Sequence, residues 1–223
     1  MKQQLDYIEK QTNSNPEYCV LWLHGLGADG HDFSDIIPSL NLNPDLGIQF
    51  IFPHAPIQPV SLNGGMAMRS WFDFNTLGPY TSVDINELDM IKQALLALIE
   101  KKGYSAKNTI IAGFSQGGAL ALYTGLSHHT PFLGVIGLST FVPAQQHLAK
   151  HLNPDTKKTH LLMAHGKLDP VVPYQLGEAS FQALTALGYT IDFQAYMMMH
   201  QVVPDELTYI GQWINQRFTE SGI

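Results

Sequence analysis

The sequence is poor in cysteine and in basic residues. Its single cysteine, Cys19, cannot close an intrachain disulfide, so nothing indicates an oxidising compartment. No helix start or cationic neighbour is expected beside Cys19, so we interpret it as a small buried apolar residue rather than a catalytic thiol. Lysine and arginine number 12 against 19 acidic residues, for a formal net charge of −7. Without a basic patch, neither nucleic acid nor an anionic membrane surface is an expected partner.

Long apolar runs are missing as well. No stretch approaches the roughly 18 residues of a membrane-spanning helix. The first ten residues lack the apolar core of a signal peptide. The expected location is therefore the cytoplasm, with no stable membrane insertion. Apolar residues make up 45% of the chain, which is typical of a globular protein, and 223 residues suit a single domain over 1–223.

Strand-like and helix-like segments alternate along the chain. Residues 18–23, 49–52 and 109–112 are short apolar runs, typical of strands buried on both faces of a sheet. Further strands are expected at 132–138, 160–164 and 190–196, and helices at 32–40, 84–102, 119–127, 174–187 and 204–218. The alternation predicts an α/β fold with a largely parallel sheet and helices on both faces. Ligands of such sheets bind outside the carboxyl ends of the strands.

Residues 53–81 interrupt this alternation with frequent proline and glycine, including Gly78 and Pro79. An irregular segment of this length is usually functional or a lid. It carries the flexible or aromatic side chains Met66, Met68, Trp71 and Phe72. These side chains suit an apolar acyl-binding groove, although they could equally pack in the core.

A Gly-x-Ser-x-Gly motif, Gly113 to Gly117, lies between an expected strand and an expected helix. This context is required for a nucleophile elbow, a sharp turn that exposes the serine hydroxyl. Ser115 is therefore the candidate nucleophile, and a tight turn without catalytic role is the alternative. An oxyanion needs two N–H donors. We expect them from Gln116, after the serine, and from Leu26, between two glycines at the end of the first apolar strand.

A serine hydroxyl needs a base, and the base needs an acid to orient it. In hydrolases built this way the chain order is serine, acid, histidine. His200 follows the last expected strand and Asp169 follows the one before it, so both are expected at the same sheet edge as Ser115. The weaker candidates are His165, which precedes the acid, and Asp155 and Asp192. Histidines 128, 129, 147, 151 and 160 are interpreted as solvated.

Six stretches of the chain resemble the acyl-protein thioesterase and small carboxylesterase family. They are residues 23–33, 52–60, 69–73, 113–120, 165–173 and 199–200. The resemblance implies an α/β-hydrolase fold without a large cap domain, and the triad Ser115, Asp169 and His200 with Leu26 and Gln116 as oxyanion donors. It also implies hydrolysis of carboxylic esters or acyl thioesters without metal or organic cofactor.

The sequence departs from this family at two places. Three methionines, Met197 to Met199, stand where a glycine is common before the histidine. Phe141 stands where a bulkier aromatic residue is common, and it is counted with Met66, Trp71 and Phe72 among the candidate substrate-binding residues. The expected substrates are small acyl esters or thioesters, S-acylated proteins and lysophospholipids.

Two other functions are known for chains with a fold of this kind, a silent binding protein and a serine peptidase. A catalytically silent hydrolase fold that binds a ligand would usually lose a triad residue, and none is lost here. A serine peptidase on this fold generally needs a larger cap, for which the chain has no room. An apolar patch near the site would allow a weak homodimer, which sequence alone does not decide.

Overall fold

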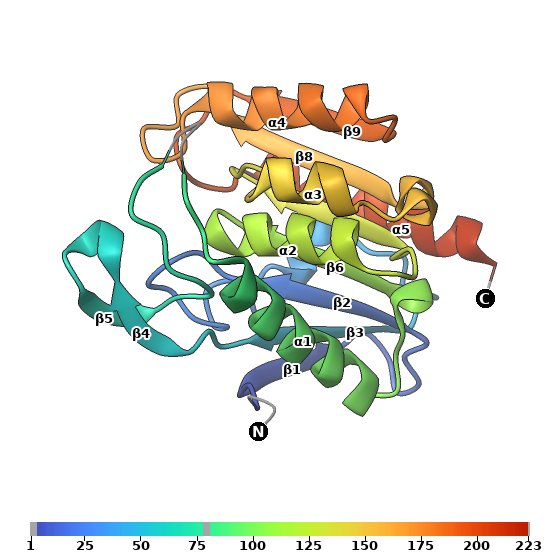
Figure 1. Ribbon diagram of the computed structural model, residues 1–223. Coiled ribbons are helices and arrows are strands. Elements are labelled where there is room, and N and C mark those ends of the chain that lie inside the picture. Colours follow the sequence, from blue (N-terminus) through green and yellow to red (C-terminus); the bar gives the residue numbers. More distant parts are fainter. Residues whose placement is uncertain (1–3, 78–80, 223) are drawn as a thin grey trace.

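Seven strands form the main sheet in the part of the chain that the structure describes, residues 4–77 and 81–222 (Figure 1, a computed structural model). The strand order is β1-β3-β2-β6-β7-β8-β9. Their bounds are β1 Tyr7–Gln11, β2 Tyr18–Leu23, β3 Ile48–Pro53, β6 Thr109–Phe114, β7 Gly134–Leu138, β8 His160–Gly166 and β9 Ile191–Tyr196. In this described sheet, β1 is antiparallel to its neighbour β3, and the other six strands run parallel to one another.

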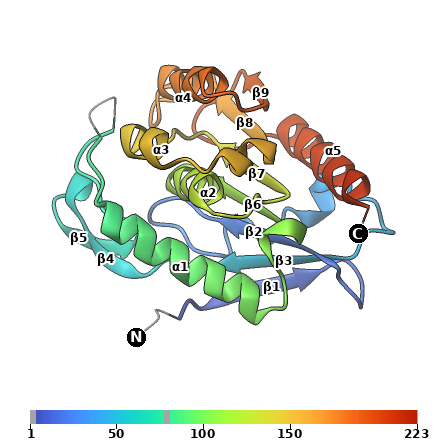
Figure 2. The same cartoon turned by 45° about the vertical axis from the view of Figure 1, so that its right-hand side comes forward.

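Helices cover both faces of the sheet. Among the described residues, four lie on one face, namely α1 Ile85–Lys101, α2 Gln116–Ser127, α3 Gln145–His151 and α4 Tyr174–Ala186. The fifth, α5 Pro204–Ser221, lies on the other face (Figure 2). Successive strand residues point to opposite faces. Leu21 and Leu23 of β2 accordingly join the core under the four helices, while Val20 and Trp22 join the core under α5. The predicted α/β architecture is confirmed.

Helix α5 is bound to the short 3₁₀ helix η1 (Ile37–Leu40), which follows the loop after β2. A methyl group on Gly211 of α5 would meet the Leu40 carbonyl oxygen at 1.6 Å, so only glycine allows this approach. The amide of Asn215 accepts a hydrogen bond from Asn43 N–H (2.9 Å) and donates one to Asn41 O (3.3 Å). We call this contact the α5–η1 seam.

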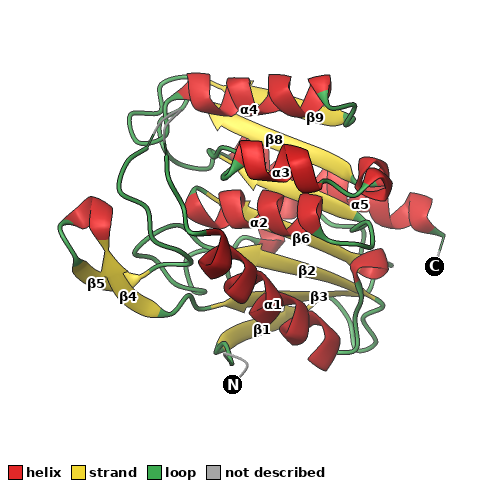
Figure 3. Ribbon diagram, in the orientation of Figure 1, coloured by secondary structure: helices red, strands yellow, loops and turns green. Residues whose placement is uncertain are grey.

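The structure differs from the expected elements in four places. Strand β1 was not predicted, because its edge position leaves it only partly buried and mixed in polarity. Residues 53–81 contain an antiparallel hairpin, β4 (Ile57–Val60) and β5 (Met66–Arg69), with a 3₁₀ turn η2 (Ser61–Asn63) at its tip (Figure 3). The expected helix at 32–40 is a series of turns ending in η1, and α3 was not expected. Gly78 and Pro79 lie outside the described residues.

Two further 3₁₀ helices, η3 (Ala106–Asn108) and η4 (Pro154–Lys158), precede β6 and β8. No helix within residues 4–77 and 81–222 is long and apolar enough to cross a membrane. Cys19 is buried in β2, and burial raises the pKa of its thiol to about 12. A thiol with this pKa carries almost no thiolate at neutral pH, which fits the interpretation of Cys19 as a core residue.

Candidate active site

Ser115 occupies the sharp turn between β6 and α2. Its backbone has φ 53° and ψ −118°, a region that residues other than glycine rarely adopt. The turn is closed by Ser115 N–H, which donates to Leu138 O (2.8 Å), and by the Thr140 hydroxyl, which donates to Ser115 O (2.7 Å). A Cβ on Gly117 would meet the His24 carbonyl oxygen at 2.4 Å. The flanking glycine therefore lets α2 begin directly against the end of β2, as a nucleophile elbow requires.

Asp169 and His200 are paired at the same sheet edge. Asp169 Oδ2 lies 2.7 Å from His200 Nδ1, and Asp169 Oδ1 accepts the N–H groups of Val171 and Val172, each at 2.9 Å. The Asp169 side chain is buried, while His200 keeps 15% of its side-chain surface exposed. The two backbone donors fix the carboxylate, and the carboxylate orients the imidazole and holds its proton on Nδ1, so that Nε2 can accept a proton.

The methionine segment before His200 packs on the turn that precedes Asp169. Lys167 N–H donates to Tyr196 O (2.8 Å) and Leu168 N–H donates to Met198 O (3.1 Å). A Cβ on Gly166 would meet Met198 O at 2.4 Å, so the glycine permits this contact. These bonds hold the ends of β8 and β9 together and thereby bring the acid and the histidine into range.

A second histidine approaches the same acid. His165 Nε2 lies 3.5 Å from Asp169 Oδ2 and 2.8 Å from the Val172 carbonyl oxygen, to which it donates. Burial lowers the pKa of His165, so it is neutral near pH 7. His165 is fully enclosed and does not line the cavity beside Ser115. It therefore supports the loop that carries Asp169 rather than facing a substrate.

Two backbone N–H groups beside Ser115 have no acceptor among the described residues. They are those of Leu26 and of Gln116, the first residue of α2. The loop that carries Leu26 is held by His24, whose Nδ1 donates to Gly25 O (2.7 Å) and whose Nε2 accepts from Ala55 N–H (3.0 Å). Burial lowers the pKa of His24 to about 4, which keeps the neutral tautomer that both bonds need. The unused donors can serve a developing negative charge.

The side chain of Gln116 has a different task from its backbone. Its Oε1 accepts from Trp71 N–H (3.0 Å), and its Nε2 donates to Ser70 Oγ (2.8 Å) and Phe72 O (2.7 Å). Trp71 Nε1 in turn donates to His24 O (2.8 Å). The segment after the hairpin is thus fastened to the elbow and to the loop after β2.

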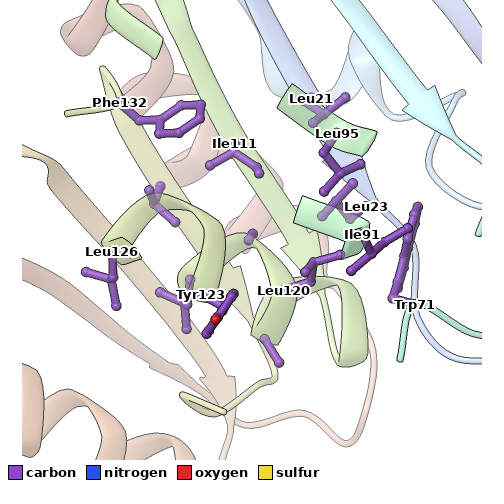
Figure 4. Close-up of a cluster of buried hydrophobic side chains, with 14 of the residues drawn as sticks. Leu21, Leu23, Trp71, Ile91, Leu95, Ile111, Leu120, Tyr123, Leu126 and Phe132 are labelled. Carbon is purple, nitrogen blue, oxygen red and sulfur yellow. The ribbon is translucent and has the colours of Figure 1, made fainter. Parts of the chain in front are cut away.

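A cavity of about 240 Å³ lies beside Ser115 and His200. Of the four candidate substrate-binding residues, Phe72 and Phe141 line it, and Trp71 and Met66 do not. Trp71 is buried in the core beside Ile91 and Leu23 (Figure 4), and Met66 is 64% exposed on the hairpin. Leu26, Ser115 and Gln116 also line the cavity. No hydrogen bond joins Ser115 to His200 within the described residues, and in ligand-free sites such bonds are often long.

A larger cavity of about 750 Å³ lies between α3 and α4 and contains neither Ser115 nor His200. Phe141 lines both cavities. We do not assign the active site to this larger cavity, because neither Asp169 nor His200 lines it. Phe141 separates the two spaces.

One group of residues has the composition of a metal site. Ligand atoms of Asp29, His31 and His54 lie within 4.8 Å of one another on the loops after β2 and β3. His54 Nδ1 accepts the Gly30 N–H (3.0 Å), which places the ring proton on Nε2 and leaves no lone pair there. A metal ion would have to break this bond, so the three residues do not form a prepared site.

Several residues at the site were not identified from the sequence. His24, Asp32, Phe74 and Phe114 contact the elbow or line the cavity. His24 lies inside the motif that pointed to Leu26, so its position was the available signal. Nothing in the sequence near Asp32 indicated the cavity. Of the five histidines interpreted as solvated, His129 and His160 are exposed, His128 and His147 are partly buried, and the side chain of His151 is outside the described part.

Comparison with known proteins extends these observations. Residues 7–217 match the model of the phospholipase/carboxylesterase family. The chain is 33% identical to acyl-protein thioesterase 1 of Mycosarcoma maydis over 94% of this chain and 95% of that protein. It is 34% identical to the probable carboxylesterase SOBER1-like of Arabidopsis thaliana, over 91% of this chain and 79% of that protein.

Solved structures agree. The crystal structure of Zea mays acyl-protein thioesterase 2 superposes with a TM-score of 0.86 at 28% identity, over 95% of this chain and 98% of that one. The crystal structure of Arabidopsis thaliana SOBER1 gives 0.84 at 32% identity, over 90% and 99%. The predicted α/β-hydrolase fold is confirmed, and the part of the chain that the structure describes adds only the β4–β5 hairpin outside the layers rather than a large cap.

Proposed function

Because the chain belongs to the phospholipase/carboxylesterase family and is a hydrolase of esters and thioesters, we propose that Ser115 is its nucleophile. His200 is the general base and Asp169 orients it. The N–H groups of Leu26 and Gln116 are the oxyanion donors. The observation that carries this proposal is the 2.7 Å bond between Asp169 and His200 at the edge of the cavity that Ser115 lines.

In the first half of the reaction, Ser115 Oγ attacks the carbonyl carbon while His200 Nε2 takes its proton. The carbonyl oxygen becomes negative and accepts hydrogen bonds from Leu26 and Gln116. The tetrahedral intermediate collapses, and the imidazolium gives its proton to the departing alkoxide or thiolate. The acyl group stays on Ser115 as an ester.

In the second half, water replaces the alcohol or thiol. His200 removes a proton from the water, which attacks the acyl-enzyme carbonyl, and the same N–H donors hold the second oxyanion. Collapse returns the proton to Ser115 and releases a carboxylic acid. Each step uses only groups of this chain, the substrate and water.

The cavity supports substrates with a short acyl chain. Its volume of about 240 Å³ lies below the usual range of roughly 300–1,000 Å³ for ligand pockets, and its lining is mostly apolar. We propose small carboxylic esters and acyl thioesters as substrates, with S-acylated proteins and lysophospholipids as larger carriers of the same bond. The proposed triad can attack oxygen esters and thioesters alike. The preference of the enzyme for one of the two bonds therefore depends on the leaving group.

The decisive experiment is a series of p-nitrophenyl esters and acyl thioesters of graded chain length, assayed with wild type and Ser115→Ala. We expect Ser115→Ala to lower kcat by roughly 10³-fold or more, since the nucleophile is removed. A fluorophosphonate should label the wild type at Ser115 and leave the variant unlabelled.

Two control measurements distinguish a variant that is inactive because it lacks the nucleophile from one that is inactive because it is unfolded. Circular dichroism and urea unfolding of Ser115→Ala should match the wild type. Retained activity in folded Ser115→Ala would show that another residue is the nucleophile. A folded wild type that neither hydrolyses any ester nor takes the label would favour the silent, ligand-binding alternative.

A further inference from the structure

Asp32 is an exposed acidic residue in the wall of the cavity beside Ser115, and no other described residue of that wall is an aspartate, glutamate, lysine or arginine. It lies six residues after Leu26 on the loop that follows β2, and it lines the cavity together with Ser115 and His200. No lysine or arginine lines the described cavity. An acid in such a position opposes a purely apolar ligand, because its charge must remain hydrated when the ligand binds.

The Asp32 carboxylate has no structural partner in the described part of the chain. It accepts no hydrogen bond and forms no ion pair there, so it caps no turn. Asp29, three residues earlier, differs: its Oδ1 accepts from His31 N–H (2.8 Å) and contacts His31 Nδ1 (3.0 Å). These hydrogen bonds lower the pKa of Asp29, whereas partial burial of the Asp32 carboxyl group and the charge of Asp29 raise the pKa of Asp32.

The backbone that carries Asp32 is fixed. Gly30 N–H donates to His54 Nδ1 (3.0 Å), and Asp32 N–H donates to Asp29 O (3.1 Å). A Cβ on Gly30 would meet Phe52 O at 2.3 Å, so the loop lies directly on β3. The fold therefore sets the place of the Asp32 backbone at the cavity, and no hydrogen bond or ion pair among the described residues holds its side chain away from that cavity.

Phenylalanine rings form much of the remaining wall. Four line the same cavity as Asp32, namely Phe72, Phe74, Phe114 and Phe141. Aromatic faces attract cations, and quaternary ammonium groups are typically bound by aromatic rings with a carboxylate nearby. The combination of rings, one unpaired carboxylate and no basic side chain suits a cation better than an anion or a neutral polar group.

We propose that Asp32 and the phenylalanine wall bind a quaternary or substituted ammonium group of the substrate, next to the ester or thioester bond. This rests on the proposed function of Ser115 and names the substrate class for that site. The cation belongs either to the leaving group or to the acyl group. The same carboxylate repels the carboxylate product, which favours its release after hydrolysis.

The test compares substrates that differ only in charge. For the leaving group, S-butyrylthiocholine is paired with its uncharged carbon analogue, S-(3,3-dimethylbutyl) thiobutyrate. For the acyl group, p-nitrophenyl 4-(trimethylammonio)butyrate is paired with p-nitrophenyl 5,5-dimethylhexanoate. The ratio of kcat/KM for the charged and uncharged member is measured in wild type, Asp32→Asn and Asp35→Asn.

Asp35 is a matched control because it is an exposed acid on the same loop that pairs with Lys10 and does not line the cavity. In wild type, kcat/KM should be higher for the charged substrate than for the uncharged one in at least one of the two pairs. A higher salt concentration should lower this ratio. Asp32→Asn should lower that ratio about fivefold, the scale of a solvent-accessible ion pair, whereas Asp35→Asn should leave it in place. The pair that responds identifies the side of the bond that carries the cation.

A binding measurement separates this proposal from the proposed function. Calorimetric titration with hexyltrimethylammonium should give weaker binding to Asp32→Asn than to wild type. If wild type hydrolyses none of the four substrates and still binds hexyltrimethylammonium more tightly than Asp32→Asn does, the triad assignment fails and the cation site stands. Unchanged ratios in both pairs, equal binding, or an equal loss in Asp35→Asn would overturn the role of Asp32.

Discussion

Oδ2 of Asp169 accepts the hydrogen bond of His200 Nδ1–H at 2.7 Å, while its Oδ1 is occupied by two backbone N–H groups. Because the two oxygens have different hydrogen-bond partners, the effect of replacing Asp169 by asparagine can be predicted. An asparagine would keep its oxygen on the N–H groups of Val171 and Val172 and present its NH₂ group to His200. The imidazole would then carry its proton on Nε2 and could not accept one from Ser115.

We therefore expect Asp169→Asn to fold normally and to lose roughly 10⁴-fold in kcat, as the equivalent change does in serine proteases. Steady-state kinetics on a p-nitrophenyl ester and urea unfolding measure the two effects separately. Activity within tenfold of wild type would show that Asp169 does not set the tautomer.

The side chain of Gln116 is expected to stabilise the fold. Its replacement by alanine leaves Trp71 N–H without an acceptor in a buried region, while Ser70 Oγ and Phe72 O keep the hydrogen bond that joins them (2.8 Å). One unsatisfied buried group costs about 1–3 kcal/mol, so Gln116→Ala should lower the free energy of unfolding by about that amount. Gln93→Ala is the control, since Gln93 is exposed on α1, and should change it by less than about 0.5 kcal/mol. Equal unfolding midpoints for both variants would contradict the assignment.

Phe141 is expected to limit acyl chain length. Because it lines both the cavity of about 240 Å³ and the larger one of about 750 Å³, Phe141→Ala should connect them. A few methylenes of additional binding are worth roughly tenfold or more in kcat/KM. The ratio of kcat/KM for dodecanoate over butyrate p-nitrophenyl esters should rise by that amount. Phe181→Ala, on α4 and outside both cavities, serves as control, and an unchanged ratio in Phe141→Ala would place the limit elsewhere.

Glu206 in α5 makes the stability of the fold dependent on pH. It is 1% exposed, its Oε1 has no partner within the described residues, and burial raises its pKa from 4.5 to about 7. The folded state therefore binds a proton that the unfolded state has released between pH 4.5 and 7. The contribution of Glu206 is complete below pH 4.5 and is lost as pH rises to 7, by about 3 kcal/mol.

Glu206→Gln removes this dependence, because glutamine does not ionise. The difference in free energy of unfolding between Glu206→Gln and wild type should shift in favour of the variant from pH 4.5 to pH 8. Denaturant unfolding at both values measures it, with Glu220→Gln at the exposed end of the same helix as control. A difference that stays constant with pH would mean that Glu206 is ionised in the folded protein.

The sequence predicted the central strands because their patterns are local, and it placed Ser115, Asp169 and His200 at one edge of the sheet, where the structure pairs Asp169 with His200 beside the cavity that Ser115 lines. The run before Gly113 and the helix after Gly117 are visible as hydrophobic periodicity, and the order of Ser115, Asp169 and His200 follows from a known arrangement. Edge strand β1 and the β4–β5 hairpin were missed, since exposed strands lack a clear apolar pattern.

The cavity wall was harder to predict because it is built from segments distant in sequence. Phe114 adjoins the serine, but Asp32 and Phe74 reach the cavity only through the folding of two loops. The chemistry of Trp71 and Met66 suits an acyl-binding groove, but the fold places Trp71 in the core and Met66 on the surface. Side-chain type identifies candidates, whereas direction depends on tertiary contacts.

The α5–η1 seam joins the segment after His200 to the segment after Leu26 and Asp32. These two segments adjoin residues that line the cavity. Neither can open locally unless the contact between Gly211 and Leu40 is broken. In native-state hydrogen exchange, amides of residues 37–43 and 207–215 would then share one opening energy and lose protection together. On heating, the enzyme would then lose activity in a single cooperative step, because neither of the two segments can unfold locally without the other.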